Sequence, residues 1–400
     1  MRILSVTAQK VDSTGSGVFL TELTGGFEKL GHQQAVICGS VPGEPINLGD
    51  HIRLFPVLYK TPALPFPICG MSDEMPYEST RYCDLNEEMT GQLLAAFQSA
   101  VQNAVESFQP DVILCHHLYF LAALIRRMYP QIPVYGQCHG SDLRQIRKNS
   151  WQRQQIMEGI RNLDGIFALH AQQKETIVEF FGVPEERVYV LGTGYNSDVF
   201  HLQQEANVQQ DSNRTRLIFA GKLSEKKGLF SLLRALSLLE NPQDYELVLA
   251  GGWGNEAEYR QICHLAESAP CPVTFLGRLN HRQLALEMNK SHAFILPSFY
   301  EGLPLVLIEA MACGLKTICT DLPGIRPWLD RAIPNHGTCF VTPPRMYNED
   351  EPLPEDLPVF EEALKCAIES LKHMPRPDPD QVRQLSWDAL CREYCGIWNP

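Results

Sequence analysis

Short apolar runs rich in β-branched residues alternate with longer stretches of helical periodicity along the whole chain. This alternation is typical of βαβ units, which build the parallel sheets of the α/β class. In the first half, strands are predicted at residues 2–7, 34–38, 112–115, 134–137, 165–169 and 188–191, and helices at 19–30, 86–108, 118–128 and 172–181. In the second half, strands are predicted at 216–220, 246–250, 273–276, 293–296 and 317–320, and helices at 228–239, 256–268, 281–289 and 304–312.

A polar stretch rich in Gln and Asn interrupts this alternation at residues 200–215, and we interpret it as a linker that permits a hinge. A length of 400 residues also suits two domains. The predicted organisation is a Rossmann-like domain at 1–199, the linker, a second Rossmann-like domain at 216–384 and a terminal helix at 385–400. Ligands of open α/β sheets bind at the carboxyl ends of the strands, so we expect a site in a cleft between two doubly wound domains.

Composition and charge exclude several classes of protein. The net charge of −13 argues against nucleic acid as a partner, because phosphate binding needs a basic face. The longest apolar runs, 120–125 and 303–308, are far shorter than the ~18 residues of a membrane span. The N-terminus MRILSVTA lacks the features of a secretory signal, so we expect a cytoplasmic protein.

Cysteine usage predicts neither a disulfide framework nor a metal site. The 13 cysteines are scattered without metal-ligand spacing, and their number is odd. The closest pair, Cys391 and Cys395, is one helical turn apart without a nearby His or third Cys to complete a site. We therefore expect no bound metal.

The most informative segment, residues 297–314, has the sequence PSFYEGLPLVLIEAMACG. A predicted strand ends before it, and Pro304 is expected in the first turn of the following helix. The amides of Leu303 and Leu305 would then point at an anion, with the helix dipole behind them. Gly302 would let the backbone approach a ligand closely.

Two carboxylates flank this predicted anion site, Glu301 in the loop and Glu309 two turns into the helix. A carboxylate beside a phosphate is unfavourable, so we expect both to accept hydrogen bonds from hydroxyl groups, such as those of a sugar and a ribose. The alternative is that Glu301 caps the helix and that Glu309 faces solvent.

The spacing from Glu301 to Glu309 resembles the E-x7-E motif of retaining GT-B glycosyltransferases of family 4, also called glycosyl transferases group 1. The resemblance implies a GT-B fold, with two Rossmann-like domains facing a cleft. It also implies that Glu301 contacts hydroxyls of the donor sugar and that Glu309 binds the ribose of the nucleotide.

A lysine-rich turn adds to the resemblance. AGKLSEKKG, residues 220–228, is similar to the G-R-L-x-x-x-K-G motif of the family, whose two cations hold the donor diphosphate. Lys227 matches, whereas Lys222 replaces the usual Arg and so loses its planar bidentate fork. The alternative, most relevant to Lys222 and Lys226, is a solvated cluster in a turn.

Two glycines precede the first predicted helix, and they resemble the glycines of the family's first loop, which approach the donor phosphate and the acceptor. Gly17 is the better match, and Gly15 is an acceptor-side candidate. A dinucleotide fingerprint is disfavoured because Leu20 occupies the place of the third glycine. A merely structural turn is the alternative.

Histidines follow two of the predicted strands. His139, in GQCHGSDL, matches a histidine that lies beside the donor sugar in the family, so it is our candidate for orienting donor and acceptor. His116 and His117 are candidates for lining the acceptor pocket. The alternative for each is an ordinary satisfied histidine.

The clearest positive cluster continues from this loop onto a helix and contains Arg144, Arg147, Lys148 and Arg153. An acceptor phosphate would suit it, as would peripheral association with the anionic inner face of a membrane. An ordinary solvated helix is the third interpretation.

Other segments extend the resemblance over most of the chain. LGTGYNSDVF at 191–200 is similar to the end of the family's first domain, and GTCFVTPP at 337–344 to its closing strand. In FLGRL, the backbone around Leu279 would contact the base. Residues 385–398 match the terminal helix that crosses back to the first domain, whereas the Pro-rich residues 42–86 have no match.

The resemblance implies a glycosyltransferase that moves a sugar, with retention, from a nucleotide diphosphate donor to a glycan, lipid-linked or small-molecule acceptor. We expect a UDP-sugar as donor and no cofactor or metal, because Lys222, Lys227 and the helix N-terminus would supply the positive charge. Two alternatives stay open, a nucleotide-sugar epimerase or hydrolase of the same fold and a non-catalytic nucleotide-sugar-binding protein. The oligomeric state is open as well.

Overall fold

The computed structural model describes residues 1–11, 13–72, 75–203, 214–348 and 350–398. The chain divides into two compact units, Met1–Thr193 with Trp387–Pro400, and Gly194–Ser386. The division thus follows Thr193, six residues before the end of the first domain as predicted from the sequence. Of the predicted linker 200–215, residues 204–213 lie outside the described residues, and Phe200 is buried in the core of the second unit.

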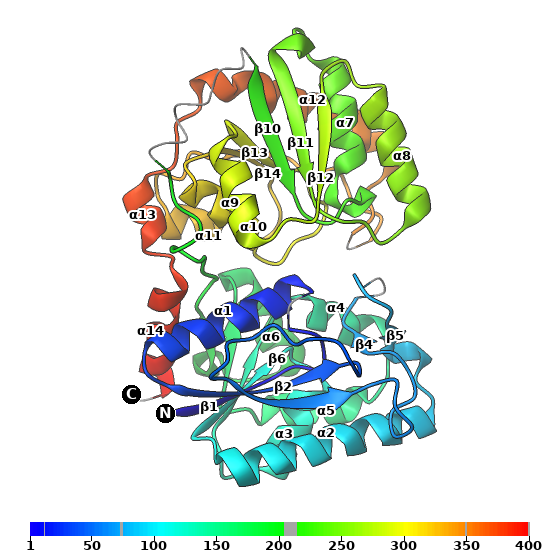
Figure 1. Cartoon of the computed structure of the whole chain (residues 1–400), viewed down its shortest axis with the longest axis vertical. Coiled ribbons are helices and arrows are strands. Elements are labelled where there is room, and N and C mark those ends of the chain that lie inside the picture. The colour runs from blue at the N-terminus through cyan, green and yellow to red at the C-terminus, as the bar shows by residue number, and fades with distance from the viewer. Residues whose placement is uncertain (12, 73–74, 204–213, 349, 399–400) are drawn as a thin grey trace. The chain divides into compact units, whose positions relative to one another are not determined.

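The first unit is built on a seven-stranded parallel sheet, with strand order β3-β2-β1-β6-β7-β8-β9 (Figure 1). Its strands are β1 (Arg2–Val6), β2 (Gln33–Ser40), β3 (Arg53–Leu58), β6 (Val112–His116), β7 (Val134–Gln137), β8 (Gly165–Ala168) and β9 (Val188–Val190), and a small pair is formed by β4 (Cys69–Gly70) and β5 (Thr80–Arg81). Its helices are α1 (Gly15–Lys29), α2 (Glu87–Phe108), α3 (Phe120–Met128), α4 (Ser141–Lys148), α5 (Arg153–Arg161), α6 (Ala171–Phe181) and α14 (Trp387–Trp398).

In helix α2, the local sequence determines where the helix begins, where it ends and which face is buried. The side chain of Asn86 caps its first turn by accepting from the amide of Met89 at 2.9 Å. It ends at Gln109 in the left-handed conformation, before Pro110. Its buried residues recur at helical spacing, at Leu93, Phe97, Val101 and Ala104.

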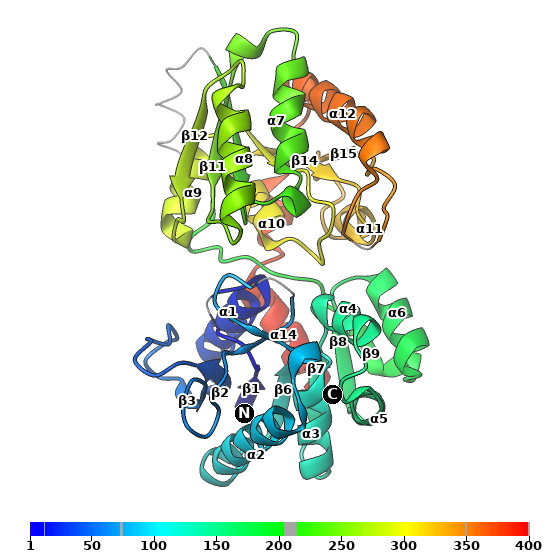
Figure 2. The same cartoon turned by 90° about the vertical axis from the view of Figure 1, so that its right-hand side faces the viewer.

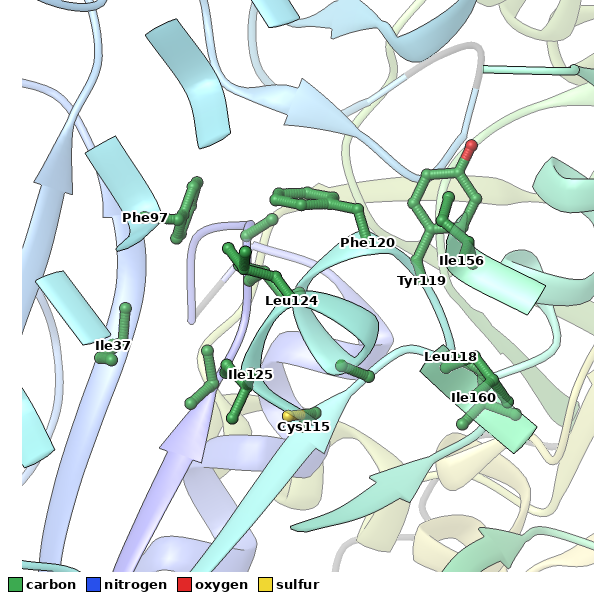
Figure 3. Packing of buried hydrophobic residues seen from close by; sticks show 14 of the residues in the cluster. Ile37, Phe97, Cys115, Leu118, Tyr119, Phe120, Leu124, Ile125, Ile156 and Ile160 are labelled. Atoms are coloured by element: carbon green, nitrogen blue, oxygen red, sulfur yellow. The ribbon is translucent and has the colours of Figure 1, made fainter. Parts of the chain in front are cut away.

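The main core of the first unit lies under α2, α3 and α5, where Phe97 of α2 packs against Phe120 of α3 with ring centroids 5.6 Å apart (Figure 3). Helices α1 and α14 cover the other face of the sheet (Figure 2). Tyr394 of α14 contacts Phe27 of α1 and Phe167 of β8, with ring centroids 5.9 and 4.3 Å away. The C-terminal helix is therefore part of the first unit.

The Pro-rich stretch 42–86 contains a strand that the hydrophobic pattern did not predict. β3 pairs in parallel with β2 at the edge of the sheet, and its register places Pro56 opposite Cys38. An edge strand tolerates proline, because one side of its backbone needs no ladder hydrogen bond.

The second unit has a six-stranded parallel sheet, with strand order β12-β11-β10-β13-β14-β15. Its strands are β10 (Thr215–Ala220), β11 (Tyr245–Ala250), β12 (Val273–Gly277), β13 (Ala293–Leu296), β14 (Lys316–Thr320) and β15 (Cys339–Val341). Its helices are α7 (Leu229–Leu238), α8 (Glu256–Glu267), α9 (His281–Asn289), α10 (Leu305–Ala312), α11 (Ile325–Ala332), α12 (Leu357–Glu369) and α13 (Pro379–Arg383).

Both faces of this second sheet are buried, and the alternation along β10 shows it. Leu217 and Phe219 belong to one apolar cluster, together with residues of α7, α8 and α12. Ile218 and Ala220 belong to another, with residues of α9, α10 and α11. Burial on both faces explains why the strands are near-continuous apolar runs.

In each sheet the strand order reverses once. The reversal lies between β1 and β6 in the first unit and between β10 and β13 in the second. The loops that leave the two central strands diverge at such a point, and this opens a crevice at the carboxyl edge of the sheet. Among the predicted site residues, Lys227 and Glu301 follow strands at these two reversals, and His116 ends such a strand.

Candidate functional site

In the second unit, an ion pair joins the loops that follow β10 and β13. Lys227 Nζ lies 2.6 Å from Glu301 Oε1, and Ser298 Oγ donates to the same oxygen at 2.7 Å. Lys227 is in the short 3-10 helix Glu225–Lys227, and Glu301 is five residues beyond β13. In the part of the chain that the structure describes, Glu301 Oε2 receives no hydrogen bond, so it is available to a hydroxyl group.

A glycine allows the two loops to approach so closely. Gly228 has φ +71°, and a Cβ at this position would lie 2.0 Å from the carbonyl oxygen of Pro297. The amide of Phe299 donates to the carbonyl of Lys226 at 3.0 Å, which ties the loops together. Any larger residue at 228 would separate Lys227 from Glu301.

Helix α10 begins one residue later than predicted. Pro304 is its N-cap residue, with φ −74° and ψ 110°, and Leu305 is the first helical residue. Glu309 is therefore the fifth residue of α10, little more than one turn into the helix. The partly buried Gly302 and the buried Leu303 precede the cap.

The two alternatives to hydroxyl binding, a helix cap at Glu301 and solvent exposure of Glu309, are wrong. No side chain caps α10, so Glu301 is not its cap. Glu309 does not face solvent either, because only 7% of it is exposed. Binding of a hydroxyl group by Glu309 stays a prediction.

Two further cations lie over the glycine-rich loop after β11. A Cβ on Gly254 would be 2.9 Å from Lys222 Cε, and one on Gly252 would be 2.3 Å from Arg278 Nε. Together with Lys227, these side chains place three cations in the loops that follow β10, β11 and β12. Sequence reasoning missed Arg278, although it singled out its neighbour Leu279, which packs partly buried against the core.

The neighbouring Lys226 does not belong to this group of cations. Its ammonium pairs with the buried Asp350 at 2.9 Å, and half of its side chain is exposed. Lys226 therefore offers a natural control for Lys227.

In the first unit, three histidines gather after β6 and β7. His116 Nδ1 lies 3.2 Å from His139 Nε2, and the two rings stack with centroids 5.4 Å apart. The ring of His117 lies 4.8 Å from that of His139. Phe19 of α1 packs edge-on against His139 at 5.1 Å. The structure thus brings together three residues that the sequence analysis named separately.

Asp142 holds the two loops that carry these histidines. Its buried carboxylate accepts from the amide of Leu118 at 2.8 Å and from the amide of His139 at 3.3 Å. Between these anchors, His117 adopts φ +80°, a costly conformation for a residue with a side chain. Sequence reasoning missed Asp142, which lies in the first turn of α4 and accepts from an amide three residues before it.

Burial keeps the three histidines neutral. It lowers the pKa of His116 to about 3, and the neighbouring His117 lowers it further. Burial also lowers the pKa of His117, and it lowers the pKa of His139 strongly, with additional repulsion from the other two rings. A neutral imidazole both donates and accepts a hydrogen bond, which suits contact with sugar hydroxyls.

The N-terminus of α1 lies beside this cluster. Thr14 is its N-cap, and the Thr14 side chain accepts from the amide of Gly17 at 3.1 Å. A Cβ on Gly17 would meet the carbonyl oxygens of Lys10 and Val11, both at 2.9 Å, so Gly17 is needed for internal packing. Gly15 has open space around it. Contacts of either glycine with a ligand stay predictions.

The predicted basic cluster is not one solvated helix. Arg144 is buried, whereas Arg147 and Lys148 are exposed at the end of α4. Arg153 begins a separate helix, α5. Arg147 lies over the ring of Phe180, 5.6 Å from its centroid.

The surroundings of Cys395 also differ from the expectation. His32 Nε2 lies 3.2 Å from Cys395 Sγ, so a histidine is nearby after all. Within the described residues, no group of three or more His, Cys, Asp or Glu side chains could hold a metal ion. In the same residues, no helix is long and apolar enough to cross a membrane.

Two family models match the chain one after the other, and the first also covers residues 42–86, for which the sequence analysis found no match. Residues 13–199 match Glycosyltransferase Family 4, and residues 202–347 match Glycosyl transferases group 1. The chain belongs to this glycosyltransferase family. The histidine cluster and the Lys227–Glu301 pair both lie within the matched segments of the chain.

Curated relatives of low sequence identity support this family membership. An uncharacterized glycosyltransferase of Methanocaldococcus jannaschii is 23% identical over 54% of this chain and 58% of its own length. Glycogen synthase of Mycobacterium tuberculosis is 23% identical over 60% of this chain and 58% of its own length. The serotype-specific mannosyltransferase WbdA of Escherichia coli is 28% identical over 43% of this chain and 23% of its own length. This chain thus spans little more than half the length of the first two relatives.

Solved structures confirm the predicted GT-B fold. Sucrose-phosphate synthase of Thermosynechococcus elongatus superposes with a TM-score of 0.69 and 18% identity, over 100% of this chain and 98% of that chain. HepE of Anabaena, solved in complex with UDP-glucose, superposes with a TM-score of 0.67 and 14% identity over 99% of both chains.

Proposed function

We propose that the protein is a retaining glycosyltransferase that uses a nucleotide diphosphate sugar, with UDP as the nucleotide. The observation that carries the proposal is the Lys227–Glu301 pair at the reversal of strand order, which comes shortly before the buried Glu309 on α10. Support for UDP comes from HepE, a structural neighbour that binds UDP-glucose.

In this proposal the cations act on the leaving group. Lys227 and Lys222 lie close to the donor diphosphate, and the amides of Leu303 and Leu305 add the positive end of α10. These groups stabilise the negative charge that develops as the bond between the anomeric carbon and the diphosphate breaks. No metal is then required, because protein cations supply this charge.

The carboxylates and a histidine orient the donor. Glu301 accepts from hydroxyls of the sugar, Glu309 accepts from the ribose, and the backbone at Leu279 contacts the base. His139 stays our candidate for orienting donor and acceptor. The acceptor oxygen forms its bond to the anomeric carbon on the face that the diphosphate leaves, and its proton passes to a diphosphate oxygen. Retention of configuration follows.

The first test is nucleotide binding by thermal shift. At ~100 times its dissociation constant, a ligand stabilises the native state by ~2.7 kcal/mol. We expect UDP to raise the melting temperature of the wild type and of Lys226→Ala, but not that of Lys227→Ala or Glu309→Ala. A shift that survives in Lys227→Ala, or no shift with UDP, GDP or ADP, contradicts the proposed donor site.

The second test separates transfer from related activities. Mass spectrometry of products with a UDP-sugar, with and without acceptor glycans, lipid-linked sugars and small sugars, should detect a new glycoside only when an acceptor is present. Turnover without an acceptor would identify a hydrolase or epimerase, and tight binding without turnover would identify a nucleotide-sugar-binding protein. Activity should persist in EDTA.

A further inference from the structure

A tryptophan is exposed in the loop that follows β11 of the second unit. Trp253 stands in the sequence Gly-Gly-Trp-Gly at 251–254, and 42% of it is exposed. The structure describes all five tryptophans of the chain, and the other four are buried or partly buried. Trp253 also lies outside the motifs that carry the family resemblance. Its exposure therefore needs an explanation from its surroundings.

Two contacts fix the orientation of the indole ring. Trp253 stacks on the ring of Tyr259 with centroids 3.9 Å apart and planes 3° from parallel. Its Nε1 donates to Glu256 Oε2 at 3.0 Å. Tyr259 in turn packs edge-on against Phe275 of β12, with centroids 6.0 Å apart. Because Tyr259 covers one face of the indole, the exposed surface belongs to the opposite face and to the ring edges.

Backbone hydrogen bonds hold this loop between its two neighbours. The amide of Gly251 donates to the carbonyl of Gly277 at the end of β12, at 2.8 Å. The amide of Leu223, in the loop after β10, donates to the carbonyl of Gly252 at 2.8 Å. A Cβ on Gly251 would lie 1.7 Å from the carbonyl oxygen of Gly221, so only glycine allows this approach. The loop that carries the tryptophan is therefore fixed at the carboxyl edge of the sheet.

The strand order places Trp253 between the groups that the proposed function assigns to the two ends of the nucleotide. Strands β12, β11 and β10 are neighbours in this order, and they are followed by Leu279, Trp253 and Lys222. The proposed function assigns the base to Leu279 and the diphosphate to Lys222. Neighbouring strands are only ~4.8 Å apart. A nucleotide that extends from Lys222 to Leu279 therefore passes over the loop after β11.

The chemistry around the indole suits a nucleotide. An aromatic side chain can stack on a base of any identity, because every base has a flat π-face. The side chains of Arg278 and Lys222 lie over Gly252 and Gly254, the two neighbours of Trp253. A neutral sugar would gain little from these cations, whereas a nucleotide presents a flat base and a diphosphate together.

We propose that Trp253, supported by Tyr259, is the platform on which the base of the nucleotide stacks. The inference rests on the proposed function, because it takes the position of the diphosphate from the proposed donor site. It adds a side chain that holds the base, where the proposed site has a backbone contact alone.

The test measures dissociation constants of UDP, GDP, ADP and inorganic pyrophosphate for the full chain by isothermal titration calorimetry. The variants are Trp253→Ala, which removes the platform, and Trp253→Phe, which keeps a ring. The control is Tyr347→Ala, because Tyr347 is 77% exposed and follows β15, at the opposite edge of the sheet from β12. Quenching of tryptophan fluorescence by the nucleotide that binds most tightly is recorded for each protein.

We expect Trp253→Ala to bind this nucleotide about tenfold more weakly and to bind pyrophosphate as the wild type does, because only the stacking contact is lost. Trp253→Phe should bind the nucleotide within about threefold of the wild type, because a ring remains to stack, but it should lose most of the quenching. Tyr347→Ala should match the wild type in both measurements.

Three results would overturn the platform. They are equal nucleotide affinity in the wild type and Trp253→Ala, an equal loss of pyrophosphate affinity in Trp253→Ala, and quenching that persists in Trp253→Phe. With each of them, a wild type that binds the nucleotide still supports the donor site. A wild type that binds none of the three nucleotides contradicts the donor site itself, and the platform with it.

Discussion

The two units place polar residues at the same point of the same topology but build them from different chemistry. The second unit holds Lys227 and Glu301 in an ion pair, with Lys222 and Arg278 nearby. The first unit holds buried, neutral imidazoles. Cations are suited to a diphosphate, whereas neutral hydrogen-bonding groups are suited to sugars. We infer that the strand-order reversal sets where polar residues gather, and that the loops set their chemistry.

A fall in pH should destabilise the first unit more than the second, and this is the largest difference that we expect between them. Because burial lowers the folded-state pKa of His116 to about 3, the unfolded chain binds more protons below pH 6.5, and stability falls as the pH falls. Between pH 7 and pH 5 the free energy of unfolding should fall by about 2 kcal/mol for each histidine that stays neutral in the folded protein. His117 and His139 act in the same direction.

Hydrogen exchange of the full chain, corrected for intrinsic rates, would measure this effect. Protection of β6 and β7 should fall by several kcal/mol from pH 7 to pH 5, and that of β10 and β13 by less. Among the described residues, His292 is the one histidine of the second unit with a lowered pKa. An equal loss of protection in both units would remove the contrast between them.

Replacement of Lys227 should have the next largest effect. Lys227→Met removes a cation from the leaving diphosphate and leaves Glu301 with only Ser298 as a partner among the described residues, so we expect kcat/KM to fall about 100–1,000-fold. Steady-state kinetics with the donor identified by thermal shift would measure this. Lys226→Met, which alters the adjacent lysine, should change kcat/KM less than about twofold, because Lys226 pairs with Asp350 and not with Glu301. Similar losses in both variants would argue against a specific role for Lys227.

Gly228→Ala tests how the loops of the second unit are held together. The left-handed backbone at 228 and the 2.0 Å approach of a Cβ to Pro297 should cost about 2 kcal/mol or more. Gly91→Ala in α2 of the first unit meets no atom within 4 Å, and it should stabilise the protein by about 0.5–1 kcal/mol. Urea denaturation would compare the two, and a neutral Gly228→Ala would mean that the loops can separate freely.

The smallest effect is expected at His116. His116→Asn keeps a polar group near the position of Nδ1 and can retain the hydrogen bond to His139. His116→Phe has no such group and loses this hydrogen bond. One lost hydrogen bond of about 1 kcal/mol predicts a roughly fivefold lower kcat for His116→Phe, with the donor KM unchanged. Nitrogen chemical shifts of His139 should report an altered tautomer in His116→Phe alone. Equal kcat values in the two variants would exclude positioning of His139 by His116.

The donor-side candidates could be predicted because their residues are close in sequence. Glu301, Gly302 and Glu309 lie within one loop and helix, and Lys227 lies in one turn after a strand. The first-unit site could be predicted only in part. Asp142 holds a backbone 24 residues away. No local pattern signals such a contact.

The sequence by itself determined the alternation of strands and helices, the two-unit α/β organisation and the family, because hydrophobic periodicity and short motifs act over a few residues. Tertiary structure alone decided the pairing of Lys227 with Glu301 and the gathering of His116, His117 and His139. It also decided that β3 forms within a Pro-rich stretch. The physical reason is that these features arise from strand order and from close backbone approaches between loops, which depend on contacts between distant segments of the chain.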